Sequence, residues 1–581
     1  SFSERVDATL LPQMTMTRLD RKITSHFLSN SVLLLLFTAS IVFVENSTKY
    51  RFAVTAFVII HKRCSPSTPH LGSMTRFFLA EDGTDIPSMT QKNKEVDTCT
   101  STSDNNIEIP WLIVGGGIHG VHIATRLLGI AGILPENVCI VDDNPALLHK
   151  WKFRTAATGM EYLRSSAGYH LDLDEHSLRR HFGVDHRQIS LRKKHKKSKK
   201  EKKSSFTNVA SKNGQMFTKD YERPRLDIFN QHCDYVVKKY GLDHLHTRGL
   251  VTTIEPTDNH VKVAISLLDD DGKRGNIIYT AQNVILALGN DEPTYADWVD
   301  EDDLKLGLVE HLFDEQNTNA RDSHCQKVSS FTQSQGRNQN EISDVAVIGG
   351  GISAAHKALE LVRIKQSPIT SSTSTGIVHM ISRHALQVQQ FDTHQDWMMD
   401  RAASKRSEDG GGTGTPKCQK RFASSSSLKQ RRMLIAKERV PGTITPAIHR
   451  GNDGLCYAIE NGDIRWHQAE VLAKRILHGE RIRMELSLSC GDTIEVDKVL
   501  LATGFGTKRP GGKLIQDLVE NIGLKVSEFC GFPICNENLA WHPRIYVSGA
   551  LAELELGPSA RNIAGARLGA ERILETIKAR L

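Results

Sequence analysis

The first clear pattern along the chain is a block of apolar residues that runs into three glycines and then into an amphipathic stretch. The apolar block is Ile109–Val114, and the amphipathic stretch extends to Leu134. Such a pattern predicts a strand, a tight turn and a helix. A second apolar strand, Val138–Val141, follows and leads into Asp142. The segment therefore predicts a βαβ unit with parallel strands.

The same pattern recurs in residues 344–362 (DVAVIGGGISAAHKALELV), again as strand, glycine turn and helix. The next apolar segment, Ile377–Ile381, predicts the second strand of this unit and runs into Ser382, Arg383 and His384. Two such units predict an α/β protein with two Rossmann-like, three-layer dinucleotide-binding domains.

The first turn has the spacing Gly115-x-Gly117-x-x-Gly120. In such a motif the first glycine permits the tight turn, the second lets the backbone approach a pyrophosphate, and the third lets helix and strand pack closely. Asp142 lies 22 residues beyond Gly120 at the end of the next strand, where a carboxylate can accept hydrogen bonds from ribose hydroxyls. These residues predict a site for FAD.

The second turn has the spacing Gly349-x-Gly351-x-x-Ala354, and its second strand ends without a carboxylate. A 2′-phosphate repels a carboxylate and pairs with a guanidinium, so Ser382 and Arg383 favour NADPH over NADH. Arg383 is the predicted phosphate contact, the alternative being an ordinary surface arginine at a strand end.

Segments of low apolar content interrupt these elements and are predicted to be disordered insertions, because they cannot offset the entropy of ordering. The block Arg192–Lys203 carries nine Lys or Arg in twelve residues and accounts for most of the net charge of +7. A solvated linker is the preferred interpretation, and a nuclear-localisation or nucleic-acid patch is the alternative. The predicted insertions are Leu191–Gly214, Asn317–Asn340, Gln366–Gly376 and Ala402–Gln430.

Residues 1–106 are set apart as a leader. Val32–Val44 is apolar over 13 residues and follows a basic stretch, which is typical of a signal-peptide core or a weak membrane anchor but short for a bilayer span. The chain begins with Ser1, and Met74 offers a second start. We expect a cytoplasmic protein, with membrane or secretory targeting through residues 32–44 as the alternative.

The ten cysteines show no metal-ligand spacing, so no metal site is expected, and they fit a reducing compartment better than a disulfide framework. Cys530 and Cys535 form a C-x4-C pair in a loop near the C-terminus. Because this loop is far in sequence from the first glycine motif, we interpret the spacing as coincidental rather than as a redox dithiol.

Three further segments give the chain a resemblance to two-dinucleotide-binding flavoproteins, most closely the lysine/ornithine N-monooxygenase type of flavin monooxygenases. Asn283–Asn290 (NVILALGN) and Asp497–Gly506 (DKVLLATGFG), which includes Gly504, resemble the two crossings between the FAD and NADPH domains. Arg544–Ala566 resembles the closing strand and helix. The resemblance implies an NADPH domain inserted into the FAD domain. The expected order is an N-terminal FAD segment (107–316), a linker (317–340), the NADPH domain (341–496) and a C-terminal FAD segment (497–581).

The resemblance also implies that a helix beginning near Gly557 and Pro558 directs its N-terminus at the flavin, since such a terminus stabilises negative charge. In many relatives an acid follows the glycine of the last strand, whereas Ala550 follows Gly549 here and Glu553 is the first acid. That ribityl contact is therefore in doubt.

Met160–Phe182 corresponds to the segment of relatives that lines the flavin and substrate pocket. It offers Arg164, Ser165, Ser166, His170 and Asp172 as polar contacts, the alternative being a loop and helix that cover the flavin. Candidate residues near the nicotinamide are Gln390, Asp392 and Trp397, of which Trp397 suits a core position equally well.

The implied activity is a monooxygenase reaction in which NADPH reduces FAD, O2 reacts, and one oxygen atom passes to a small nucleophile such as an amine. No catalytic triad, paired carboxylates or general acid or base stands out. Two alternatives remain: a flavin reductase or oxidase that passes electrons to another acceptor, and a non-catalytic flavin-binding sensor.

Overall fold

A computed structural model describes residues 36–44, 51–59, 106–184, 215–268, 274–289, 292–315, 344–366, 376–398 and 417–580. The chain divides into two units, Ser1–Cys99 and Thr100–Leu581. In the first unit, β1 (Leu36–Val44) pairs in antiparallel fashion with β2 (Arg51–Ile59), so the apolar segment expected as a signal core or anchor contributes a hairpin strand. None of the described helices has the length and apolar character needed to span a bilayer.

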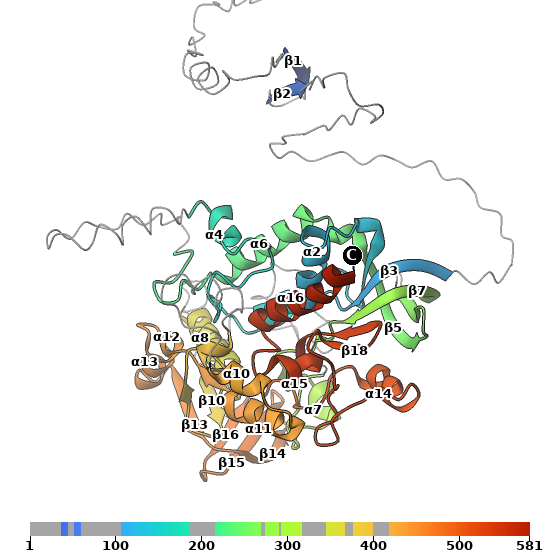
Figure 1. Ribbon diagram of the computed structural model, residues 1–581. Coiled ribbons are helices and arrows are strands. Elements are labelled where there is room, and N and C mark those ends of the chain that lie inside the picture. Colours follow the sequence, from blue (N-terminus) through green and yellow to red (C-terminus); the bar gives the residue numbers. More distant parts are fainter. Residues whose placement is uncertain are drawn as a thin grey trace, which may run out of the picture. The chain divides into compact units, whose positions relative to one another are not determined.

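The second unit contains a seven-stranded sheet in the order β18-β19-β7-β3-β4-β5-β6, in which β6 also pairs with β7 (Figure 1). Strands β19, β7, β3, β4 and β5 run parallel to one another, as βαβ units require. The strand bounds are β3 Asn106–Val114, β4 Val138–Asp142, β5 His246–Pro256, β6 Val261–Leu268, β7 Arg274–Leu286, β18 Ala540–His542 and β19 Ile545–Val547.

Helices α2 and α16 pack against each other beside this sheet (Figure 1). Their apolar faces join β3, β4 and β7 in the largest hydrophobic core of the unit. The helices here are α2 Ile118–Gly129, α3 His149–Ala157, α4 Ser177–His181, α6 Leu226–Lys239, α14 Gly512–Glu520, α15 Glu553–Leu556 and α16 Ile563–Arg580, with short 3₁₀ turns at Pro135–Asn137, Leu242–Leu245 and Gly549–Ala552.

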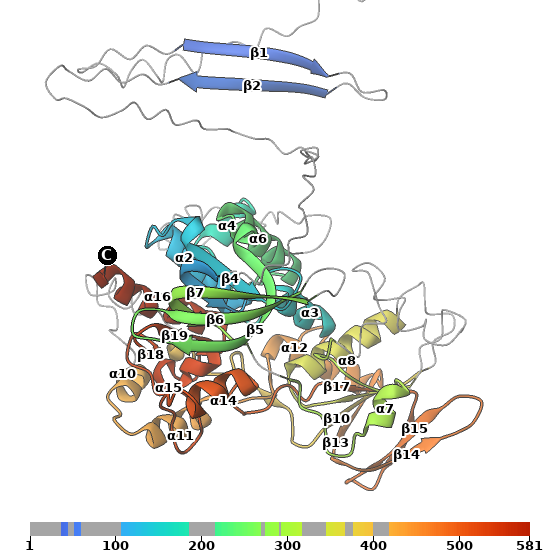
Figure 2. The ribbon, with the colours of Figure 1, turned by 90° about the vertical axis from the view of Figure 1, so that its right-hand side faces the viewer.

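A second, fully parallel sheet has the order β13-β10-β9-β17-β8 and carries α8 against β9 and β10 (Figure 2). Cores lie around β9 and β10 with α8, and around β17 with the antiparallel sheet β14-β15-β16. The strands of the parallel sheet are β8 Val309–His311, β9 Val345–Ile348, β10 Val378–Ser382, β13 Ile464–Gln468 and β17 Lys498–Leu501. The antiparallel sheet contains β14 Val471–Leu477, β15 Arg483–Leu488 and β16 Thr493–Val496, and a separate two-stranded sheet contains β11 Gln387–Val388 and β12 Thr443–Ile444. The helices of this region are α7 Glu301–Lys305, α8 Ile352–Lys365, α10 Lys417–Ala423, α11 Leu428–Glu438, α12 Pro446–Arg450 and α13 Leu455–Glu460, with a 3₁₀ turn at Gln395–Trp397 (η5).

Two expected domain boundaries cut through this second sheet and need correction. β8 lies within the expected N-terminal FAD segment (107–316), and β17 lies within the expected C-terminal FAD segment (497–581). Both strands pair inside the second sheet, with Val499 opposite Val309 and Leu500 opposite Val347. The physical reason is that β17, within the second crossing, pairs with β9 inside the sheet, and β8 then pairs with β17 as the edge strand.

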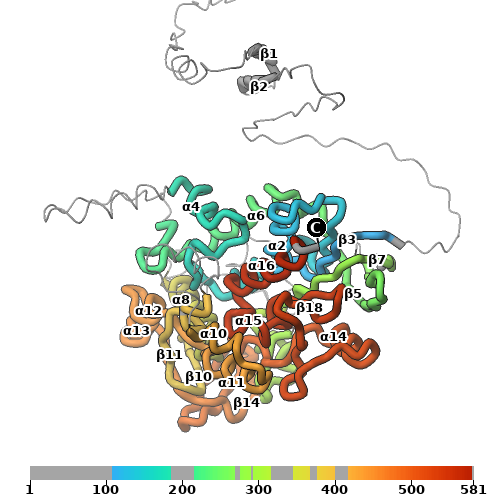
Figure 3. Tube along the Cα trace, viewed as in Figure 1, coloured from blue at the N-terminus to red at the C-terminus, as the bar shows by residue number. Residues whose placement is uncertain are grey.

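The expected disordered insertion at 402–430 is wrong in its second half. Residues 417–430 form α10 and the start of α11, and Phe422 is buried. Helix α11 contacts α15, which follows the last strand of the first sheet (Figure 3). The basic insertion, the 317–340 linker and most of the segment 366–376 lie outside the described residues.

Candidate cofactor-binding turns

The first glycine turn joins β3 to α2 in a geometry that glycine alone accommodates. Gly115 has φ +110°, and its N–H donates to Val141 O at 2.8 Å. A Cβ on Gly115 would lie 2.6 Å from Ala287 O, and a Cβ on Gly120 would lie 1.8 Å from Gly115 O. Both glycines are therefore needed for the strands and helix to approach this closely.

Gly117 differs from these two because its outer side is open. It is the N-cap residue of α2, and a Cβ placed on it would meet no atom within 4 Å. The N–H groups of the first helical turn have no partner inside the helix and carry partial positive charge. An open turn with free N–H groups at a helix N-terminus has the features that an anion-binding site requires.

Asp142 is fixed beside the same turn. Gly116 N–H donates to Asp142 Oδ2 at 2.5 Å, and Asn144 N–H donates to Oδ1 at 2.9 Å. The carboxylate at the end of β4 is thus oriented next to the glycines, which is where a ribose diol would lie on a dinucleotide bound to this turn.

The second glycine turn repeats the main backbone contact of the first. Gly349 has φ +149°, its N–H donates to Ile381 O at 2.8 Å, and a Cβ on it would lie 2.7 Å from Ala502 O. Ala354 takes the place of the third glycine and is buried; its Cβ lies 3.3 Å from the position of a Cβ on Gly349. The second turn therefore has the close packing of strand and helix seen in the first.

The two turns differ in the residue that follows the second strand. Ser382 stands where Asp142 stands in the first unit, and it is buried. Its hydroxyl donates to His384 O at 3.0 Å and accepts from Trp466 Nε1 at 2.9 Å. Ser382 thus uses its hydroxyl within the protein, whereas the next side chain, Arg383, is exposed.

The second turn is narrower than the first on its ligand side. A Cβ on Gly351 would lie 3.0 Å from Gly442 Cα, so two bare glycine backbones face each other. The glycine pair leaves less open space than Gly117 has.

The segment after β19 comes back to the first turn. His119, in the first turn of α2, lies 3.1 Å from Ser548 Oγ through its Nδ1, and its ring lies 3.5 Å from the Cβ position of Gly549, which has φ +65°. Burial lowers the pKa of His119 to about 4, partly opposed by a hydrogen bond with the Arg561 backbone, so the ring is neutral. His119 occupies a variable position of the glycine motif, so no sequence signal marks it.

The closing helix begins later than expected. Residues 557–562 form turns, with Ala560 N–H donating to Gly557 O at 3.1 Å, and α16 starts at Ile563. Gly557 has φ +82° and is followed by the buried Pro558, which together end the preceding helix. The interpretation of a helix start near Gly557 is therefore wrong by several residues.

Trp397, a candidate for the nicotinamide side, is core. A Cβ on Gly557 would lie 2.7 Å from its ring, and the indole is buried among Phe422, Ile435 and Phe532. Gly504, in the second crossing, has φ +77° and accepts a hydrogen bond from Thr294 N–H at 2.9 Å.

Arg164 connects the loop before α4 with the segment after β11 and with β12. Its guanidinium donates to Gln390 O at 2.7 Å, to Gln389 O at 2.9 Å and to Thr443 Oγ1 at 2.6 Å. Burial lowers the pKa of Arg164, and the charge of Asp392 opposes this effect. Arg164 thus holds these three segments together through hydrogen bonds. Ser166 Oγ accepts from Gly168 N–H at 3.3 Å within its own loop.

Asp172 and His170 belong to a buried polar network rather than to a pocket lining. Asp172 accepts from Ser177 Oγ at 2.5 Å, Lys239 Nζ at 2.9 Å and Tyr240 OH at 2.8 Å. Burial would raise the pKa of Asp172, but these hydrogen bonds outweigh it and hold the pKa below its usual range. The expectation that Asp172 contacts a polar substrate is therefore not supported by its contacts.

Buried histidines around this network predict loss of stability in acid. Burial lowers the pKa of His170 to about 3 and that of His232 to about 4, from 6.5. As the pH falls, these histidines are protonated in the unfolded chain before they are protonated in the folded protein. The folded state is therefore fully stable above pH 6.5, and the free energy of unfolding declines as the pH falls towards about 4. Denaturant unfolding across this range is expected to show the decline. Replacing the exposed His244 by Gln should leave the slope unchanged, and stability independent of pH would contradict the prediction.

Glu553 is the centre of an arginine cluster that the sequence did not reveal. The carboxylate is 2% exposed and binds Arg432, and Arg561 Nε at 2.8 Å. Arg439 lies nearby; burial and the charge of Arg561 lower its pKa. Arg432 lies in α11 and Arg439 directly follows it. Because α11 begins inside the expected insertion 402–430, the sequence analysis did not predict this helix or the cluster that it helps to form. It could attract an anionic group of a cofactor or substrate.

Cys530 and Cys535 are free thiols. Burial raises the pKa of Cys535 to about 12, which keeps it from acting as a thiolate nucleophile near neutral pH. This geometry favours the coincidental interpretation of their spacing.

No protein-family model and no curated protein sequence matches the chain. Among solved structures, ornithine hydroxylase (PvdA) from Pseudomonas aeruginosa matches with a TM-score of 0.53 at 17% identity, covering 81% of this chain and 99% of that chain. Its reduced form matches with a TM-score of 0.52 at 16% identity over the same shares. Identity this low establishes the fold and not the substrate. The chain therefore shares the fold of this ornithine hydroxylase.

Proposed function

We propose that the protein is an FAD- and NADPH-dependent oxidoreductase, a monooxygenase of the N-hydroxylating type that acts on a small amine. One observation carries the proposal: two glycine turns with matching geometry end in chemically different residues, Asp142 in one and Ser382 with Arg383 in the other. Two turns in one chain suit an electron donor and an electron acceptor. The fold shared with an ornithine hydroxylase is in keeping with an amine substrate.

The first turn is the proposed FAD site. Its open N-terminal helix turn at Gly117 would hold the pyrophosphate, and Asp142 would accept hydrogen bonds from the ribose. A bound flavin supplies the redox chemistry, taking electrons from reduced nicotinamide and passing them to O2. Neutral His119 lies where the closing segment meets this turn, so it can orient a bound group without adding a positive charge.

The second turn is the proposed NADPH site, with Gly349, Gly351 and the N-terminus of α8 towards the pyrophosphate. Arg383 is exposed at the strand end and would pair with the 2′-phosphate. The protein itself would then contribute two things. Arg164 would hold the Gln389–Gln390 segment in a fixed position beside the first domain, and the apolar cluster around Trp397 (Phe422, Ile435, Phe532 and Leu554) would exclude water between α11 and α15.

The test uses the purified full chain and measures three quantities: bound FAD released by heat, NADPH oxidation, and the ratio of hydroxylated amine to hydrogen peroxide formed with lysine, ornithine or diamines. A monooxygenase is expected to carry FAD and to couple NADPH oxidation to product with one of these amines. NADPH oxidation that yields only peroxide, or electron transfer to quinones, would indicate a reductase or oxidase. Failure to bind FAD would overturn the proposal.

Arg383→Asp is expected to weaken the binding of NADPH by about 1 to 3 kcal/mol and to shift the cofactor preference towards NADH, because a charge-assisted hydrogen bond to the 2′-phosphate is replaced by repulsion. The measurement is the KM for each nucleotide in steady-state oxidation. Arg450→Asp, another exposed arginine in the same region of the chain, serves as the matched control. An unchanged KM for NADPH in Arg383→Asp would remove the assignment.

A further inference from the structure

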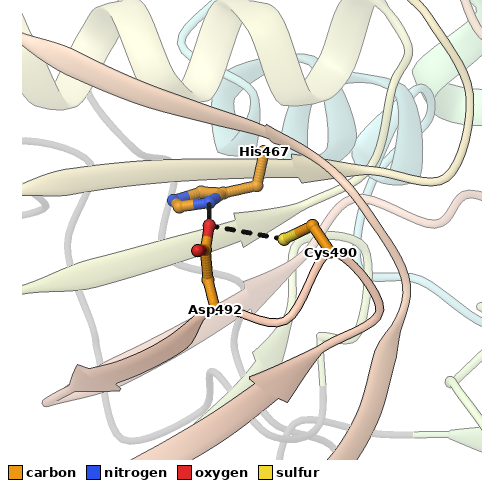
Figure 4. A group of neighbouring side chains, drawn as sticks. All are labelled: His467, Cys490 and Asp492. Carbon is orange, nitrogen blue, oxygen red and sulfur yellow. Dashed lines mark hydrogen bonds and ion pairs between the residues drawn. The ribbon is translucent and has the colours of Figure 1, made fainter.

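A group of three different metal-ligand side chains lies where β13 meets the turn between β15 and β16, and none of the three is a residue of the glycine turns. His467 comes from β13, and Cys490 and Asp492 come from the turn between β15 and β16 (Figure 4). One ligand atom from each residue lies within 4.8 Å of the others. Imidazole, thiolate and carboxylate are the donors that Zn²⁺ accepts.

The turn that carries two of these donors is held in place by its backbone. Gly491 has φ +95°, and Leu488 N–H donates to Asp492 O at 2.8 Å, which closes the hairpin. The hairpin is tied to the segment after β13, because Ser489 N–H donates to Glu470 O at 2.8 Å and Glu470 N–H donates to Ser489 Oγ at 2.9 Å. The three donors therefore converge before any ligand binds, which lowers the cost of ordering them.

The ring of His467 is oriented from behind by a second histidine. Its Nδ1 lies 3.3 Å from Asp492 Oδ2, and its Nε2 lies 3.1 Å from His379 Nδ1 (Figure 4 shows the first contact). One ring nitrogen of His467 is thus held by a second histidine while the other faces Asp492, and such a partner on the far nitrogen orients the ring of metal-binding histidines.

We propose that His467, Cys490 and Asp492 bind one Zn²⁺ ion. Cys490 and Asp492 are exposed, so the fourth position of a tetrahedral site would be open to water. The ion would tie the β15–β16 hairpin to β13. The proposal does not depend on the proposed oxidoreductase function, because none of these residues belongs to the glycine turns or the arginine cluster.

The experiment titrates the metal-free full chain with Zn²⁺ in competition with a chromophoric chelator, and repeats the titration with Co²⁺. One Zn²⁺ per chain is expected, together with a near-ultraviolet thiolate-to-cobalt charge-transfer band. Cys490→Ser is expected to abolish that band and to lower the affinity for Zn²⁺ by more than about tenfold. Asp492→Asn and His467→Gln are expected to lower the affinity for Zn²⁺ to a similar extent. His379→Phe should weaken it by about 10- to 100-fold, as loss of an orienting partner does.

Cys456→Ser is the matched control. Cys456 Sγ also lies beside a histidine, 3.4 Å from His449 Nε2, but no carboxylate completes a group of three there among the described residues. This variant should bind Zn²⁺ like the natural chain. NADPH oxidation and circular dichroism report separately on the oxidoreductase and on folding. A natural chain that binds no Zn²⁺, or a Cys490→Ser chain that binds it equally well with the cobalt band intact, would overturn the proposal.

Discussion

Glu553→Ala is expected to lower the free energy of unfolding by about 3 to 5 kcal/mol, the cost of removing one partner from a buried ion pair. Glu553 is 2% exposed and balances Arg432 and Arg561 at once. Without the carboxylate, the positive charges of Arg432, Arg561 and the nearby Arg439 would repel one another with no negative charge from Glu553 to balance them. Because Arg432 belongs to α11 and Glu553 to α15, the packing of these two helices is expected to loosen as well.

Denaturant unfolding of the variant and the natural chain measures this effect. Asp517→Ala, which removes the partner of the exposed Lys513, is the matched control and should cost about 1 kcal/mol or less. Glu553→Gln keeps the shape of the side chain and removes only its charge, so it separates charge from packing. If Glu553→Ala costs no more than Asp517→Ala, the cluster does not stabilise the fold in the way its burial indicates.

Gly117→Ala is expected to lower the affinity for FAD by about 100-fold while leaving the fold intact. Its Cβ would meet no protein atom within 4 Å, so the chain can accommodate it, but the methyl group would occupy the open side of the turn. A pyrophosphate held away from the helix N–H groups loses charge-assisted hydrogen bonds, each about 1.5 to 3 kcal/mol, and about 2.7 kcal/mol corresponds to 100-fold in affinity.

Equilibrium titration of the apoprotein with FAD, followed by flavin fluorescence, gives the affinity. Gly275→Ala, at the start of β7 and with no neighbour closer than 3.9 Å to the added Cβ, is the control and should bind FAD normally. Gly120→Ala provides the contrast, because its Cβ would lie 1.8 Å from Gly115 O and should damage the fold itself. Normal FAD affinity in Gly117→Ala would place the flavin elsewhere.

The sequence predicted the elements of the fold that depend on neighbours along the chain. Both glycine turns, the strands on either side of them and the positions of Asp142 and Arg383 at strand ends follow from local patterns. The occupants of these turns stay predictions that the binding experiments test.

What the sequence did not predict depends on contacts between distant residues. β8 is only three residues long, so its pairing with β17 leaves no periodicity to detect. α11 is rich in basic residues and resembles a solvated segment until Arg431 and Arg432 meet Glu555 and Glu553. Asp172 resembles a substrate ligand until Lys239 and Tyr240 reach it from α6 and its C-terminal end.

The matching geometry of the two glycine turns also limits which residues each turn tolerates. Gly115 and Gly349 make the same hydrogen bond to the neighbouring strand, and each faces the carbonyl of an alanine that follows a third strand, Ala287 or Ala502. Because a Cβ on either glycine would collide with that carbonyl, the turns themselves cannot vary, and selectivity between ligands is left to the residues at the strand ends, Asp142 and Ser382 with Arg383.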